Sequence, residues 1–113
     1  MASRQSTVDY VLEQITSAGT VSARKMFGEY GIYCDGRMVA LICDDLFFVK
    51  PTVAGRNFAA GCEEAPPYGS AKPCLLISED RLEDSEWVSE LVRLTTQEIP
   101  LPKPKRPKAG RAR

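Results

Sequence analysis

The stretch RKMFGEYGIYCDGRMVALICDDLFFVK, residues 24–50, decides the fold of this chain. It holds five of the nine aromatic residues and several β-branched ones, a composition typical of strands. Asp35-Gly36 is the strongest short-range hairpin signal, because a type I′ turn needs positive φ at both central residues. Asp44-Asp45 is a second, weaker two-residue turn. The runs 38–43 and 46–50 have strand length, so the sequence predicts a β-meander.

The Asp35-Gly36 loop also predicts how its flanking strands pair. A two-residue loop sets Cys34 opposite Arg37 and Tyr33 opposite Met38. Regular alternation then predicts two faces: Tyr33, Met38, Ala40 and Ile42 on one, and Ile32, Val39, Leu41 and Cys43 on the other. Both faces are apolar in the centre. We therefore expect helices to cover much of one face and another segment to cover part of the other.

Helices are predicted on both sides of the meander. Residues 6–18 place apolar side chains on one helical face, with Ser6 as cap: Val8, Val11, Leu12 and Ile15. A short helix over residues 52–60 is capped by Thr52. The last helix has Asp84 as its N-cap, and Pro100 ends it.

The remaining strands complete an α+β domain. Gly28 and Gly31 indicate a bulge or bend, so that 21–27 and 32–34 form one bent strand. Residues 74–78 form a further strand, and Tyr68 belongs to a short one. The order is α-β-β-β-α-β-β-α: a two-layer domain over residues 1–100, an antiparallel sheet of about five strands, and the first and last helices on one face.

Composition limits the classes of function. A chain of 113 residues is expected to be one domain. It has no long apolar run and no apolar N-terminal region, which predicts a cytoplasmic protein with no membrane association. Its four cysteines have no CxxC spacing, and it has no histidine. We expect reduced thiols and no metal or other cofactor, with a redox pair of strand cysteines as the alternative.

The absence of histidine also argues against catalysis. Histidine is the commonest general base, and Ser-His-Asp and Cys-His sites are impossible within this chain. The acidic pairs Asp44-Asp45 and Glu63-Glu64 are typical of solvated turns. We expect no enzyme activity.

Charge is divided unevenly along the chain. The final stretch, residues 103–113, contains no acid and six cations: Lys103, Lys105, Arg106, Lys108, Arg111 and Arg113. The rest of the chain has nine cations and fifteen acids, so its net charge is near −6. The Pro- and Lys-rich segment 101–113 is predicted to be disordered and is a candidate nucleic-acid-binding tail; a solubilising tail is the alternative.

The entry to the meander is a candidate partner-binding site. Its cations suit an anion and its aromatics suit stacking, while its glycines allow close approach: Arg24, Lys25, Phe27, Gly28, Tyr30 and Gly31. The alternative is that strand alternation places Arg24 and Lys25 on different faces while the aromatics pack into the core.

The same residues resemble the TfoX N-terminal domain family, over residues 8–99. The matching positions are Arg24, Met26-Phe27-Gly28, Tyr30-Gly31, Tyr33, Asp35-Gly36, Ala40-Leu41 and the strand that ends at Lys50. The resemblance implies the α+β architecture predicted above and a role like that of a regulator of bacterial competence genes. Longer members carry a second, C-terminal domain with helix-hairpin-helix-like character, where this sequence has a short tail.

Three functions remain open at this point. The first is a TfoX-like regulatory domain that binds a protein partner of the transcription machinery, with nonspecific DNA affinity from the tail. The second is a stand-alone module that binds a protein or small ligand through the uncovered sheet face, with no DNA role. The third, an enzyme, has no catalytic constellation to support it. The oligomeric state is left open.

Overall fold

The computed structural model describes residues 3–26 and 28–101 of the chain. The first half contains α1 (Gln5–Gln14), the 3-10 helix η1 (Thr16–Ala18), β1 (Val21–Met26), β2 (Glu29–Cys34), β3 (Arg37–Cys43) and β4 (Leu46–Val49). The second half contains α2 (Val53–Phe58), β5 (Glu64–Ala65), β6 (Cys74–Ile77), α3 (Glu79–Glu83) and α4 (Ser85–Glu98).

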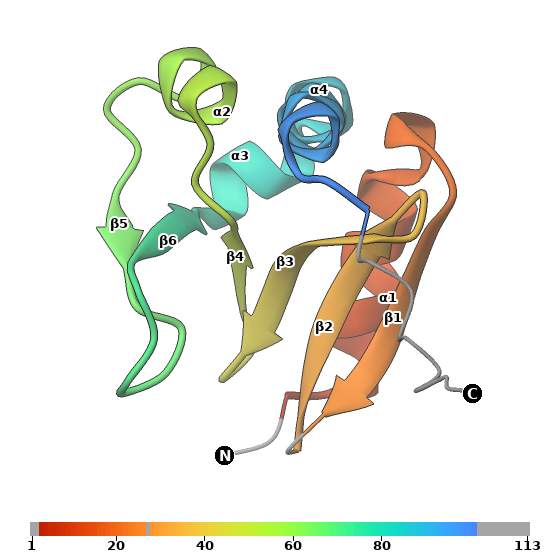
Figure 1. Ribbon diagram of the computed structural model, residues 1–113. Helices are drawn as coiled ribbons and strands as arrows, with labels where there is room; N and C mark the ends of the chain where they lie inside the picture. The colour runs from red at the N-terminus through yellow and green to blue at the C-terminus, as the bar shows by residue number, and fades with distance from the viewer. Residues whose placement is uncertain (1–2, 27, 102–113) are drawn as a thin grey trace, which may run out of the picture.

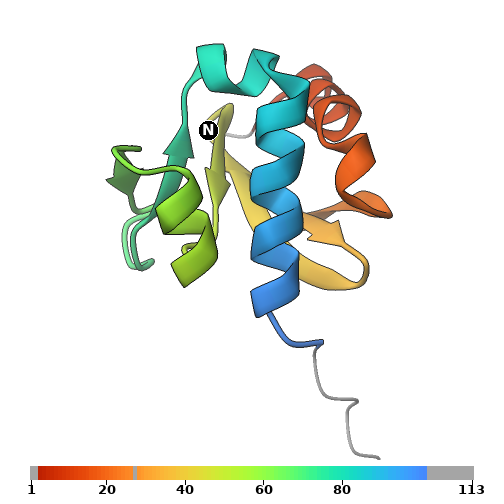
Figure 2. The same ribbon diagram turned by 90° about the horizontal axis from the view of Figure 1, so that it is seen from above.

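These elements form two layers, as the sequence predicts. In the described part of the chain the sheet has six strands in the order β1-β2-β3-β4-β6-β5, and every neighbouring pair is antiparallel. The helices pack against one face of the sheet (Figure 1). Seen from that side, α4 runs across the middle, with α1 and α2 on either side of it (Figure 2). The α+β class and the position of the first and last helices on one face are therefore confirmed.

The extra strand comes from the stretch expected to be one bent element. Residues 21–34 instead form a hairpin, in which Met26 pairs with Glu29 and Val21 with Cys34. The chain reverses between Met26 and Glu29, and Gly28 in this reversal has φ 81°. A positive φ costs glycine little, so this glycine permits a tight reversal rather than a bulge in a continuous strand.

A β-bulge at Val39 corrects the two predicted faces of the meander. The pairs Cys34–Arg37 and Tyr33–Met38 form as expected, but Ile32 then pairs with Ala40, so Val39 has no partner on β2. One extra residue shifts the alternation of everything after it. Ala40 and Ile42 consequently join Ile32 in the core beneath the helices.

Two of the three predicted N-caps form. The Thr52 side chain accepts a hydrogen bond from Gly55 N at 2.9 Å, and Asp84 accepts one from Trp87 N at 3.1 Å, as predicted. The prediction of Ser6 as a cap is wrong, because α1 already begins at Gln5. Short α3 was not predicted. Tyr68 lies in the β5–β6 loop rather than in a strand.

The main core lies between the helices and the sheet. Its fully buried members come from α1 and its C-cap, the strands and α4, and they include the following: Val8, Val11, Ile15, Ile32, Val39, Ile42, Val49, Leu75, Val88, Leu91 and Val92. A second, smaller cluster lies on the face without helices and contains Cys43, Phe48 and Cys74. Among the residues that the structure describes, none of the helices has the length and apolar character needed to cross a membrane.

Candidate functional site

A groove of about 610 Å³ opens on the sheet face that the helices leave uncovered. It crosses the ends of β1, β2 and β3 and reaches the loop between β5 and β6. Its lining combines apolar side chains with two carboxylates: Met26, Glu29, Tyr30, Met38, Leu41, Cys43, Asp44, Pro67 and Tyr68. Such a volume lies within the ordinary range for binding sites, so the groove is the candidate functional site.

The floor of the groove is built around Gly31. A Cβ atom added at Gly31 would lie 3.0 Å from Met38 Cε and 3.1 Å from Met26 Sδ. The two methionine side chains therefore meet above this glycine, on the side of the sheet opposite the helices. Methionine is flexible and polarisable, which suits a surface that adapts to its ligand.

One wall of the groove comes from a distant part of the sequence. The β5–β6 loop brings Pro67 and Tyr68 to the sheet face beside Leu41. Tyr68 is 57% exposed, although tyrosine carries a large apolar ring. An exposed ring beside an apolar floor is available to pack against a bound molecule.

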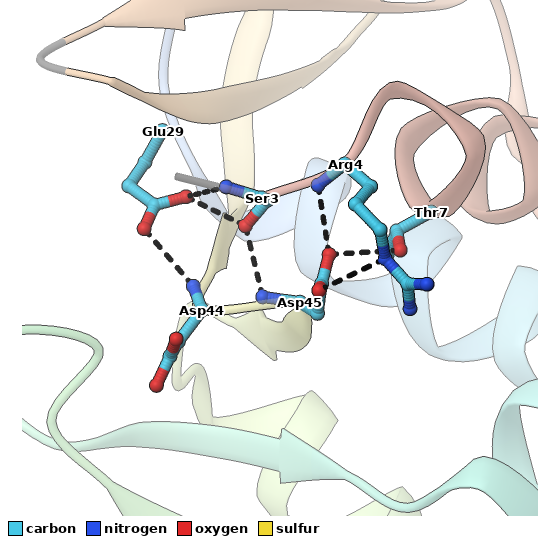
Figure 3. Close-up of polar contacts among 6 residues, drawn as sticks. All are labelled: Ser3, Arg4, Thr7, Glu29, Asp44 and Asp45. Atoms are coloured by element: carbon cyan, nitrogen blue, oxygen red, sulfur yellow. Dashed lines mark hydrogen bonds and ion pairs between the residues drawn. The ribbon is translucent and has the colours of Figure 1, made fainter. Parts of the chain in front are cut away.

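The acidic end of the groove is held in place by hydrogen bonds (Figure 3). Glu29 Oε1 accepts from Ser3 N at 2.9 Å and from Ser3 Oγ at 2.6 Å. Glu29 Oε2 accepts from Asp44 N at 3.0 Å. Both carboxylate oxygens of Glu29 are thus engaged, and they tie the N-terminal segment to the β3–β4 turn.

The N-terminal segment and the first turn of α1 also hold the β3–β4 turn. Asp45 N donates to Ser3 Oγ at 2.9 Å, and the Asp45 carboxylate accepts from Arg4 N at 2.8 Å and Thr7 Oγ1 at 2.9 Å. These hydrogen bonds, led by the one from the Arg4 backbone, hold the pKa of Asp45 below its usual value, and the Arg4 guanidinium adds to them. The pair Asp44-Asp45 is therefore a solvent-exposed turn, as predicted, that is also anchored by hydrogen bonds.

The residues predicted at the meander entry do not converge on one surface. Arg24 lies on the open face, with its guanidinium 5.5 Å from the Tyr33 ring. Lys25 is exposed and pairs with Tyr30, so it belongs to the opposite face. Tyr30 is buried, and its hydroxyl donates to Gln5 Oε1 at 3.3 Å.

The glycines of that prediction have different roles. Gly31 lies beneath the methionines of the groove floor, and Gly28 lies exposed in the β1–β2 turn. Phe27 lies outside the described residues, and so do the candidate nucleic-acid contacts of the tail: Lys103, Lys105, Arg106, Lys108, Arg111 and Arg113.

Sequence reasoning missed most of the groove. Met26, Met38 and Leu41 read as ordinary strand residues, and Tyr68 read as part of a short strand. The signal present in the sequence was Gly31 between apolar strand residues, since a glycine in a strand often marks close approach of another group.

The cysteines show no sign of a reactive site. All four are free thiols, and burial raises the pKa of Cys34, Cys43, Cys62 and Cys74. A raised pKa keeps a thiol protonated at neutral pH and lowers its nucleophilicity. Over residues 3–26 and 28–101, the structure brings together no group of three or more side chains suited to hold a metal ion.

The fold and the groove together define a small α+β domain with one helix-covered sheet face and one open, apolar face. Residues 13–99 match the TfoX N-terminal domain family, and the chain belongs to this family. The chain is also 35% identical over 108 residues to an uncharacterised 12.7 kDa protein in the trpE 5′ region of Spirochaeta aurantia. That match covers 96% of this chain and 93% of the relative.

Proposed function

We propose that this chain is a regulatory interaction domain that binds a protein partner and catalyses no reaction. Membership of the TfoX N-terminal domain family supports a regulatory role. The observation that carries the proposal is the open groove, whose methionine floor and exposed Tyr68 suit contact with another protein. The raised thiol pKa of Cys43, the groove's one cysteine, argues against a nucleophile there.

The proposal is tested by comparing the proteins captured by three tagged forms of the chain in extracts of its source organism. Wild type and the control Tyr10→Ala should retain the same partner, because Tyr10 is exposed on α1, in the helical layer. Tyr68→Ala should lose it. If all three forms captured the partner equally, the groove would not take part in the interaction, and the proposal would be wrong.

In its finer form, the proposal places this domain in transcriptional control of competence-type genes. The partner is then a component of the transcription machinery or one of its regulators. Identification of the captured protein by mass spectrometry tests this directly. If the captured partner had no connection to transcription, the role in competence would be rejected, and the proposal of a cytoplasmic interaction domain would stand.

The proposal also includes a nonspecific affinity for DNA, supplied by residues 101–113. The six cations of residues 103–113 attract a polyanion, while the remainder of the chain, near −6, repels it. If all six contact phosphates, log K should fall with log salt with a slope of about −5. Deletion of residues 101–113 should abolish binding in a fluorescence anisotropy titration. If the affinity were unchanged, the tail would not be the DNA-binding site, and Arg24 and Lys25 would be the next candidates.

The alternative is a module that binds a small ligand and has no DNA role. The volume of the groove, about 610 Å³, favours this candidate because it lies in the range of small-molecule sites. A ligand that raises the Tm of wild type but not of Tyr68→Ala would support it.

A further inference from the structure

We propose that the groove takes an extended peptide segment in which a lysine or arginine lies two residues from an apolar side chain. This inference rests on the proposed function and specifies the chemistry of the partner. Asp44 would accept the cation, while Met26, Met38 and Tyr68 would contact the apolar side chain.

The charge of the groove lining supports a cationic ligand. Two of its side chains are acids, and no cation lines it within the part of the chain that the structure describes. Glu29 already uses both carboxylate oxygens in hydrogen bonds to Ser3 and Asp44. At Glu29 an incoming cation would compete with these donors, and Asp44 is the other acid of the lining.

The carboxylate of Asp44 is placed to serve as that acceptor. Its side chain points away from the Glu29–Ser3–Asp45 hydrogen bonds (Figure 3), and it is exposed at the end of the groove. The backbone of Asp44 has φ 55°, which is uncommon for a residue other than glycine. Its N–H is fixed to Glu29 at 3.0 Å, so the backbone that carries this side chain is held in place before a ligand arrives.

The shape of the groove favours a peptide over a compact amine. The groove is open to solvent along the sheet, so a bound chain can keep one side in water while its other side contacts the floor. In an extended chain, residues i and i+2 point to the same side about 7 Å apart. One such pair can place an apolar side chain on the methionines and a cation at Asp44.

The test is selection of displayed random heptapeptides on the immobilised full-length chain. Wild type should enrich peptides with lysine or arginine two residues from a leucine, isoleucine, methionine or aromatic residue. Asp44→Asn should lose the enrichment of cations but keep that of apolar residues, because asparagine tolerates positive φ and preserves the turn. The matched control Asp80→Asn, an exposed acid on α3, should behave as wild type.

Titration of one selected peptide and its Lys→Gln version gives the size of the effect. Asp44→Asn should weaken the lysine peptide about two- to fivefold and leave the glutamine peptide unchanged. Equal weakening of both peptides, the same loss in Asp80→Asn, or no enrichment above the level of Tyr68→Ala would overturn the proposal.

The two proposals fail separately. Loss of a captured protein in Tyr68→Ala without any cation preference in the selection would retain the interaction domain and reject the peptide chemistry. If small aliphatic amines bound in a manner that depends on Tyr68 and no peptides were enriched, the groove would be a small-ligand site. That outcome would also reject the peptide proposal.

Discussion

The two hairpin turns of the meander have similar backbone conformations but different sequences. At the β2–β3 turn, Asp35 has φ 52° and Gly36 has φ 82°. At the β3–β4 turn, Asp44 has φ 55° and Asp45 has φ 62°. Each has the positive φ values of a type I′ turn, so the predicted conformation of Asp35-Gly36 is confirmed.

The difference lies in what holds each turn. The first has glycine where positive φ costs least, and Asp35 adds a hydrogen bond from Thr20 N at 2.9 Å. The second has no glycine and depends on Glu29, Ser3, Arg4 and Thr7. One turn is therefore specified largely by its own sequence, and the other is held by the N-terminal segment, the first turn of α1 and β2.

The largest effect is expected from breaking the first turn with Gly36→Val. A β-branched residue resists positive φ, so unfolding free energy should fall by about 2 kcal/mol. A Cβ at this position would also come within 3.4 Å of Leu101. Chemical denaturation measures the loss. A variant as stable as wild type would show that this turn does not need glycine.

Copying the second turn into the first, with Gly36→Asp, should have a smaller effect. Aspartate tolerates positive φ better than valine, but the first turn lacks the anchoring contacts of the second. We expect a loss of about 1 kcal/mol by the same measurement. If the variant matched wild type, the Asp-Asp sequence would be sufficient by itself.

Asp45→Asn removes the charge that Arg4 and Thr7 contact at the second turn. It should lower the unfolding free energy by less than Gly36→Asp does, because Asp45 is partly exposed. The pKa of Asp45 is lowered in the folded state, so its stabilisation is complete above the unfolded value near 4 and is lost as pH falls through the folded value. Wild type should have the higher Tm at pH 7, and the two values should converge toward pH 2. A constant difference would contradict this linkage.

The smallest effect is expected at Asp44. Asp44→Gly relieves positive φ but adds backbone entropy to the unfolded chain, so stability should change by less than about 1 kcal/mol. Its Tm should stay within a few degrees of wild type, and hydrogen exchange of residues 3–7 should be unaltered. Faster exchange there would show that Asp44 helps to hold the N-terminal segment.

Local signals account for the parts of the fold that the sequence predicted. Asp35-Gly36, Thr52 and Asp84 act through their immediate neighbours, so their roles can be read from a few residues. The bulge at Val39 has no such signal, and it moved Ala40 and Ile42 to the same face as Ile32. Strand alternation alone could not predict that change.

The candidate site was harder to predict because it is assembled from distant segments. The separation of Arg24 and Lys25 onto opposite faces follows from strand alternation, as the alternative prediction had it. Tyr68 joins Met38 in the groove only through the path of the β5–β6 loop. Ser3 reaches Glu29 across 26 positions of sequence, a contact that no local pattern indicates.

Both outer helices depend on such distant contacts. The start of α1 is held by Asp45, and at the start of α2 Glu98 adds to the Thr52 cap by accepting from Val53 N at 3.1 Å and Ala54 N at 2.6 Å. Contacts over about forty residues cannot form until the intervening chain is in place, and their loop-closure entropy slows folding. We therefore expect residues 3–101 to fold as one cooperative unit, in which neither end is stable as an isolated fragment.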